Sequence, residues 1–127
     1  MKKLFLDDIR NPPEAIGLVS LELEQIYLQG DWCIVRSYFD FCKSIQKSGL
    51  PDLISFDHDL ADDRYKLYPD DSYTEKTGYE CAKWLVDWCL ENNKQLPKFV
   101  VHSANPVGKK NIEMYLNNAT KHLLKDV

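Results

Sequence analysis

The stretch at residues 53–59 reads LISFDHD, a four-residue apolar run that stops abruptly at an acidic, histidine-bearing triplet. Such a short apolar run between polar residues is typical of a strand that is buried on both faces of a sheet. The opening stretch at residues 3–8, KLFLDD, has the same form, because its apolar run also ends in two carboxylates. Buried strands of this kind indicate an α/β protein with a mostly parallel sheet.

Helical stretches alternate with two further runs of this type, which predict strands at residues 32–35 and 98–101. Helices are predicted at residues 14–28, 38–48 and 78–93, and from about residue 109 to residue 124. This alternation implies right-handed parallel crossovers, with helices covering both faces of the sheet. We therefore expect residues 1–127 to form one domain, a three-layer α/β/α sandwich around a four-stranded sheet.

The composition excludes several classes of function. The chain has 20 acidic and 16 basic residues and a formal net charge of −4, so it lacks the basic excess of a protein that binds duplex DNA. It has no apolar run long enough to cross a membrane and no signal-peptide pattern at its start, so we expect a cytoplasmic protein. The four cysteines, Cys33, Cys42, Cys81 and Cys89, form no CxxC pair, and we expect all four to be buried free thiols.

Polar and titratable residues follow every predicted strand. They are Asp7, Asp8 and Arg10 after the first strand, Arg36 and Ser37 after the second, Asp57, His58 and Asp59 after the third, and His102, Ser103 and Asn105 after the fourth. In open parallel sheets, ligands bind beyond the carboxyl ends of the strands. The sequence therefore predicts one ligand site at this edge, to which four chain segments contribute.

The aspartates of this group predict a metal site. Asp7, Asp8 and Asp57, with Asp59 as a further candidate, would lie close together, and like charges at close range need compensation. A divalent cation is the simplest compensation, and hard oxygen ligands favour Mg²⁺, or alternatively Mn²⁺. Helix capping and turn formation are the competing explanation, since they account for Asp8 or Asp59 taken singly.

Two histidines lie directly after strands, at positions 58 and 102. Histidine titrates near neutrality, so His58 or His102 is a candidate general acid or base in phosphoester chemistry, with Asp57 as a further catalytic candidate. Metal ligation and a purely structural role remain open for both histidines.

Residues 102–110, HSANPVGKK, contain candidate ligands for a phosphate group. Ser103 and Asn105 can donate hydrogen bonds, Gly108 permits close approach of the backbone, and Lys109 brings positive charge to a helix start, where free N–H groups attract anions. Arg10 and Arg36 could complete this pocket or could instead neutralise the carboxylates. A plain turn followed by a helix cap is the alternative for the segment.

The polar, acidic stretch at residues 60–76 predicts a long loop with a functional role.

These motifs resemble the receiver domains of response regulators. The resemblance implies metal binding by Asp7 and Asp8, phosphoryl acceptance by Asp57, and a switch hydroxyl at Ser103. It also implies a receiver/flavodoxin-like sheet with strand order 2-1-3-4. We expect the chain to depart from an ordinary receiver by lacking a fifth strand after residue 124, and Lys109 lies in a different context from the receiver lysine.

A closer resemblance is to the cyclic-phosphate processing receiver domains. The segments that carry it are the LFLDD-R-P start, ISFDHDL, TGY and VHSANPVG, which lie at residues 4–13, 54–60, 77–79 and 101–108. It spans nearly the whole chain and implies a role in processing cyclic phosphates of nucleotides or RNA ends.

Our leading hypothesis is a metal-dependent phosphoesterase that acts on a cyclic or terminal phosphate of a nucleotide or an RNA end. The alternatives are a signalling receiver that is phosphorylated on Asp57 and reports to a partner protein, and a nucleotide-binding adaptor without catalysis. Whether the chain forms a homodimer is left open.

Overall fold

The computed structural model describes residues 2–60 and 77–125, and within them helices alternate with short strands. The strands are β1 (Lys3–Leu6), β2 (Trp32–Val35), β3 (Leu53–Phe56) and β4 (Lys98–Val101). The 3₁₀ segments are η1 (Pro12–Leu18) and η2 (Leu21–Leu23), and the α-helices are α1 (Glu24–Leu28), α2 (Tyr38–Ser48), α4 (Gly78–Glu91) and α5 (Pro106–Lys125). Apart from Leu60, the loop predicted at residues 60–76 lies outside the described residues.

The sheet confirms the predicted topology. Its order is β2-β1-β3-β4, and all three strand pairs are parallel. The register pairs Leu6 with both Val35 and Phe56, and it pairs Phe56 with Val101, so the four strands end side by side. Within residues 2–60 and 77–125 the sheet has four strands and no fifth.

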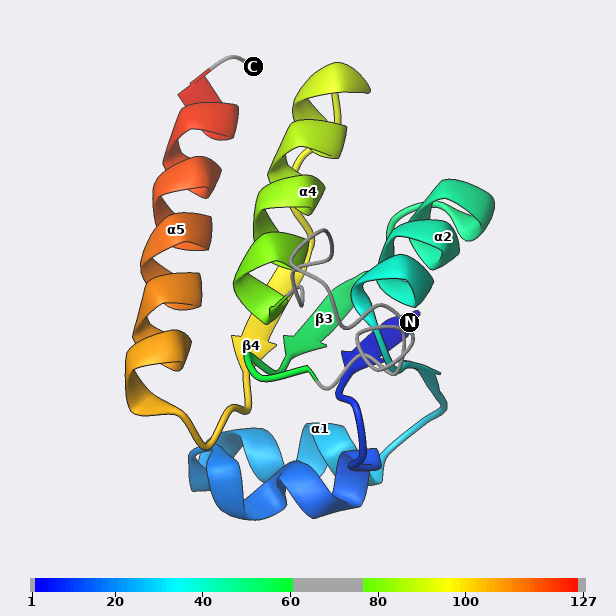
Figure 1. Ribbon diagram of the computed structural model, residues 1–127, viewed down its shortest axis with the longest axis vertical. Coiled ribbons are helices and arrows are strands. Elements are labelled where there is room, and N and C mark those ends of the chain that lie inside the picture. Colours follow the sequence, from blue (N-terminus) through cyan, green and yellow to red (C-terminus); the bar gives the residue numbers. More distant parts are fainter. Residues whose placement is uncertain (1, 61–76, 126–127) are drawn as a thin grey trace, which may run out of the picture.

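Helical segments cover both faces of the sheet. Successive residues of a strand point to opposite faces, so Leu4 and Leu6 pack into the core under α2, α4 and α5, whereas Phe5 packs with Ala15 and Tyr27 on the other side. Figure 1 shows α2, α4 and α5 as a row of neighbouring helices, with the blue η1–α1 segment set apart from them. This second layer consists of the 3₁₀ segments η1 and η2 and the short helix α1, and we call it the thin second layer.

The prediction of one continuous helix at residues 14–28 is wrong, because the segment is divided into η1, η2 and α1. The backbone of Val19 and Ser20 is extended, with ψ angles of 168° and 157°, so α-helical hydrogen bonding cannot run through them. Ile16 of η1 and the extended residue Val19 both pack against the second core.

The other helices follow the sequence closely. Side-chain caps begin α2 and α4, where Ser37 accepts a hydrogen bond from the Asp40 amide and Thr77 from the Glu80 amide. The last helix, α5, begins at Pro106, three residues before the predicted start, because proline is well suited to the first helical position. None of the described helices is long and apolar enough to span a membrane.

The expectation of four buried cysteines is wrong for one of them. Cys42, Cys81 and Cys89 are buried free thiols, but Cys33 is exposed. Cys33 belongs to β2, which is an edge strand and is only partly covered. An edge strand does not need to be apolar on both faces, so the apolar run at residues 32–35 does not require Cys33 to be buried.

Candidate acidic site at the carboxyl edge of the sheet

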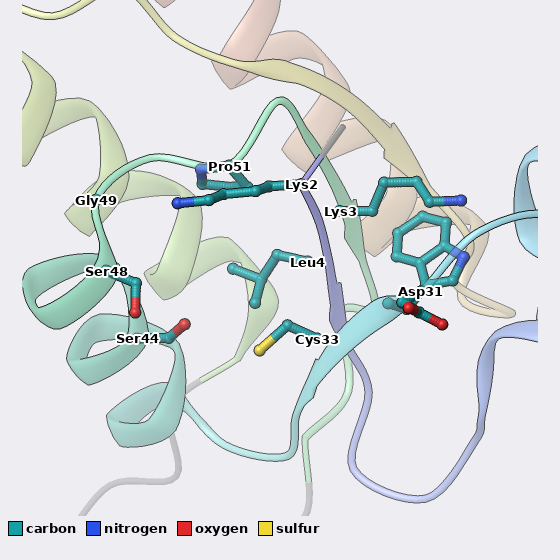
Figure 2. A pocket seen from close by; sticks show the side chains of 10 residues that line it. Lys2, Lys3, Leu4, Asp31, Cys33, Ser44, Ser48, Gly49 and Pro51 are labelled. Carbon is teal, nitrogen blue, oxygen red and sulfur yellow. The ribbon is translucent and has the colours of Figure 1, made fainter.

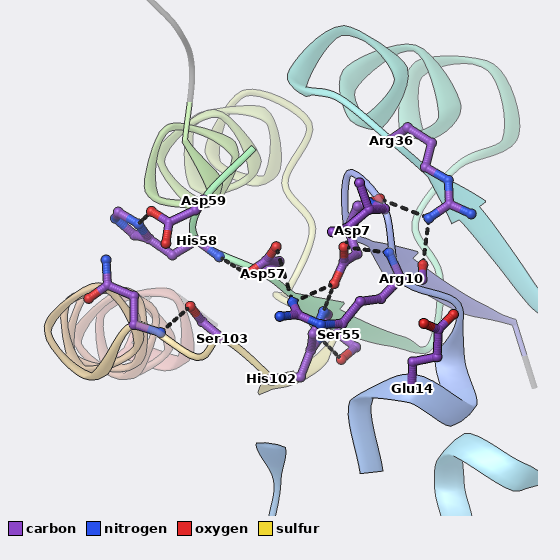
Figure 3. A network of polar contacts seen from close by, with 12 residues as sticks. Asp7, Arg10, Glu14, Arg36, Ser55, Asp57, His58, Asp59, His102 and Ser103 are labelled. Carbon is purple, nitrogen blue, oxygen red and sulfur yellow. Dashed lines mark hydrogen bonds and ion pairs between the residues drawn. The ribbon is translucent and has the colours of Figure 1, made fainter. Parts of the chain in front are cut away.

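Three residues that directly follow neighbouring strands form the centre of the site. Asp7 follows β1, Asp57 follows β3 and His102 follows β4, and the strand register brings them together. Their exposed fractions are 0%, 3% and 0%, so two carboxylates and an imidazole are buried at the edge of the sheet. Figure 3 shows this group with Arg10 beside it.

Asp7 is held by more hydrogen bonds than its neighbours. Its Oδ1 accepts from the backbone amides of Ile9, at 3.0 Å, and Arg10, at 2.8 Å. Its Oδ2 lies 3.0 Å from His102 Nε2 and 3.4 Å from Arg10 Nη1. Burial by itself raises the pKa of Asp7, but the hydrogen bonds from His102 and the two amides outweigh burial and hold this pKa well below its usual range. Asp7 is therefore a fixed negative charge.

Asp57 is shifted in the opposite direction. Burial raises the pKa of Asp57, and the negative charge of Asp7 raises it further. The amide of His58, which donates to Asp57 Oδ1 at 2.8 Å, and the Arg10 guanidinium, at 3.9 Å from Oδ2, compensate only in part. The site thus holds more negative charge than the described side chains neutralise.

The donor set fits a hard divalent cation. Asp7, Asp8 and Asp57 each offer a carboxylate oxygen, and these oxygens lie within 4.8 Å of one another. Oxygen ligands from two or three carboxylates suit Mg²⁺ and Mn²⁺. The predicted fourth carboxylate, Asp59, is not in this group, because its side chain is 68% exposed and lies 2.9 Å from His58 Nδ1. Arg10 lies between Asp7 and Asp57 and neutralises part of their charge, which is one of the two roles predicted for it.

The two histidines of the site have different surroundings. The side chain of His58 is 18% exposed, and its Nδ1 is paired with Asp59. Its ring lies against Gly108 in the first turn of α5, where an added Cβ would come within 2.4 Å of His58 Cγ. His102 is completely buried, and both of its ring nitrogens have protein partners, Ser55 and Asp7. Of these two histidines, only His58 has a side chain that solvent or a ligand reaches directly.

The segment after β4 is built as a turn and a helix cap. Ser103 Oγ accepts from the Asn105 amide, and Asn105 Oδ1 accepts from the Gly108 amide, both at 3.0 Å. Lys109 Nζ lies 3.5 Å from the carbonyl oxygen of Leu18, so Lys109 links α5 to η1. These contacts agree with the alternative of a turn and cap, and phosphate binding by these residues stays a prediction.

Arg36 supports the loop that carries Asp7. Its Nη1 donates to the carbonyl oxygens of Asp7 and Arg10, and its Nη2 donates to Asn11 Oδ1 at 2.7 Å. The side chain therefore fixes the backbone after β1. Its guanidinium is directed at this loop (Figure 3), and a phosphate contact for Arg36 stays a prediction.

Two residues of the site were missed by the sequence analysis. Ser55 and Tyr27 continue the hydrogen-bonded contacts of His102 into the thin second layer. A serine in the middle of the apolar run LISF is the signal that identifies Ser55, since a buried hydroxyl needs a partner. No local pattern identifies Tyr27.

A cavity of about 510 Å³ lies away from this site. Its lining includes Lys2, Lys3 of β1, Trp32 and Cys33 of β2, and Ser44 of α2 (Figure 2). Most of these residues belong to the amino ends of β1 and β2, so the cavity is not part of the acidic site.

The fold and the acidic edge define a receiver-like α/β domain. The chain belongs to the family described as the cyclic-phosphate processing receiver domain, which matches residues 2–118. A solved structure titled as a yeast Spc42 trimeric coiled coil fused to another structure is similar at 15% identity and a TM-score of 0.50, over 98% of this chain and 79% of that chain. At this identity the similarity concerns the fold alone. No curated protein matches the chain significantly.

The opposite pKa shifts of the two buried aspartates predict opposite effects on stability. Ionised Asp57 is disfavoured in the folded protein, so stability falls as the pH rises from about 4, the usual aspartate pKa, through the raised pKa. Ionised Asp7 is favoured, so its contribution is present above pH ~4 and is lost as the pH falls through its lowered pKa. In metal-free protein at pH 7, we expect Asp57→Asn to stabilise and Asp7→Asn to destabilise, each by about 1 kcal/mol or more.

Urea unfolding of the two variants in EDTA measures this difference, with the exposed Asp31→Asn as the control. Destabilisation of similar size in both variants would contradict the charge argument. At pH 3 the Asp57→Asn effect should disappear, since Asp57 is then protonated in both states.

Proposed function

We propose that this protein is a metal-dependent phosphoesterase acting on a cyclic or terminal phosphate of a nucleotide or an RNA end. The observation that carries the proposal is the juxtaposition of the Asp7, Asp8 and Asp57 carboxylates with a partly exposed histidine at one sheet edge. Membership of the cyclic-phosphate processing receiver family agrees with this class of substrate.

Each group at this edge has a role in the proposal. Asp7, Asp8 and Asp57 hold the cation, and a bound Mg²⁺ or Mn²⁺ would polarise a phosphoryl oxygen and lower the pKa of a bound water. Arg10 lies within 4 Å of both buried carboxylates and is 29% exposed, so its guanidinium can reach a phosphate oxygen at the same place.

His58 is the histidine that we assign to proton transfer. It is partly exposed, and the contact of its Nδ1 with Asp59 orients the ring and leaves Nε2 as the candidate for exchange with a ligand. His102 was an equal candidate from the sequence. Its burial and its two protein contacts make it a residue that holds Asp7, which is a different task.

The proposal predicts hydrolysis that depends on His58. Purified protein with Mg²⁺ or Mn²⁺ should convert a 2′,3′-cyclic or 3′-phosphate nucleotide, and phosphorus-31 NMR detects the new monoester or inorganic phosphate. Loss of a general acid or base lowers the rate about 10²–10⁴-fold, so His58→Ala should fall by that factor and retain its metal affinity. Thr120→Val, in the far half of α5, is the control. Absence of product from wild-type protein across the nucleotide panel would contradict the proposal.

The glycine that packs on His58 provides a test of geometry. In Gly108→Ala the new Cβ would approach the His58 ring to 2.4–2.7 Å, so the ring must move. Misplacement of a reacting group by about 1 Å can cost 10²-fold, and we expect turnover to fall by 10- to 100-fold with little change in Mn²⁺ affinity. Gly17→Ala is the matched control, because its Cβ meets nothing within 4 Å. Equal turnover in the two variants would show that His58 placement is unimportant.

A second candidate function is phosphoryl acceptance on Asp57, since this carboxylate follows β3 beside Asp7 and Asp8 as in receivers. Incubation with acetyl phosphate and Mg²⁺ should then add the mass of one phosphoryl group, and Asp57→Asn should prevent the addition. No mass gain in wild-type protein would count against the receiver function. Nucleotide binding without product or phosphorylation would favour the adaptor.

A further inference from the structure

A continuous chain of buried side chains leads from the thin second layer of the fold to the acidic site. Tyr27 Oη of α1 lies 2.7 Å from Ser55 Oγ of β3, and Ser55 Oγ lies 2.6 Å from His102 Nδ1. His102 Nε2 in turn lies 3.0 Å from Asp7 Oδ2. All four residues are at most 2% exposed, so solvent does not substitute for any of these contacts. Figure 3 shows Ser55, His102 and Asp7 in this order.

The hydrogen bonds of this chain can be assigned a direction. The ionised carboxylate of Asp7 only accepts, so Nε2 of His102 donates to it. With its proton on Nε2, the imidazole accepts at Nδ1, and Ser55 must donate to it. Ser55 has a single hydroxyl hydrogen, so Tyr27 donates to Ser55. Burial raises the pKa of Tyr27 to about 12, which keeps this last donor protonated. Every donor then has one acceptor, and the chain is complete only in this arrangement.

The imidazole plane is fixed as well as its two nitrogens. The His102 ring stacks on Phe5, with 4.5 Å between the ring centroids and an angle of 6° between the planes. The Tyr27 ring meets His102 edge-on, at 6.4 Å and 79°. Stacking stops the ring from tilting, and the contacts to Ser55 and Asp7 stop it from rotating in its own plane. The position of the Ser55 hydroxyl therefore fixes the orientation of the His102 ring, and the ring in turn fixes the Asp7 carboxylate.

We propose that Ser55 and Tyr27 are positioning residues of the metal site, which act through His102 to hold Asp7 in its ligating orientation. The inference rests on the metal site of the proposed function and adds two residues that lie outside it. Groups that hydrogen-bond to metal ligands commonly change metal affinity by 10- to 100-fold when they are removed. Without the Ser55 hydroxyl, Nδ1 of His102 loses its hydrogen-bond donor, and the ring is no longer held on that side against rotation in its own plane.

Single-hydroxyl deletions test this inference with two measurements. The variants are Ser55→Ala and Tyr27→Phe. The control is Thr120→Val, which removes a hydroxyl that donates to the Leu116 carbonyl oxygen at 2.8 Å in α5. Calorimetric titration with Mn²⁺ alone measures affinity, and long-range ¹H–¹⁵N NMR of the metal-free protein reports which His102 nitrogen carries the proton. A role confined to core stability would lower the melting temperature and leave the Mn²⁺ affinity unchanged.

We expect wild-type protein to carry the His102 proton on Nε2. Ser55→Ala should bind Mn²⁺ about 10-fold more weakly, with a changed Nδ1 signal. Tyr27→Phe should show a smaller change in the same direction, and Thr120→Val should match the wild type.

Two results would count against the inference in different ways. Wild-type Mn²⁺ affinity in Ser55→Ala, or an equal loss in Thr120→Val, would overturn the positioning role and leave the proposed function intact. Wild-type protein that binds no Mn²⁺ would contradict the metal site itself, and the inference would fall with it.

Discussion

The structure depends on keeping one carboxylate ionised in a place that water does not reach. Transfer of a charged carboxylate from water into a protein interior costs several kcal/mol unless hydrogen bonds replace its hydration. Asp7 receives this replacement from two backbone amides, His102 and Arg10, and Arg36 in turn fixes the loop that presents the amides. This requirement is met by three parts of the structure. They are the turn after β1, the polar end of β4, and the arginines that follow β1 and β2.

A fixed charge at Asp7 sets the properties of its neighbour. Asp57 follows the adjacent strand and is nearly as buried. It accepts fewer hydrogen bonds than Asp7, and it lies beside the ionised Asp7 carboxylate, which raises its pKa. Two carboxylates in nearly the same place therefore differ in character, because one is held as a permanent anion and the other gains from neutralisation. That asymmetry favours either a cation or a covalent change at Asp57, and both proposed functions draw on it.

Much of this arrangement was predictable, because strand ends are visible in the sequence and parallel strands bring their ends together. The meeting of Asp7, Asp8 and Asp57 follows from that rule, whereas the strand order followed from the resemblance to receiver domains. The division of tasks between His58 and His102 was not predicted, since both lie within two residues of a strand end and the sequence does not show the depth of each ring. The Tyr27 contact joins residues 28 positions apart through a helix whose boundaries the apolar period does not give. Exposure of Cys33 likewise depends on edge position.

The thin second layer has a function beyond covering the sheet. In place of one helix at residues 14–28, the chain has two 3₁₀ segments and a short helix that places the Tyr27 hydroxyl against Ser55. Ser55 interrupts an otherwise apolar strand, and a buried hydroxyl without a partner would cost about 1–3 kcal/mol. Both features are unfavourable for a simple core. They become favourable when a buried imidazole must be satisfied at Nδ1 and directed at Asp7 by Nε2, so the architecture of this face follows from the demands of the site on the sheet edge.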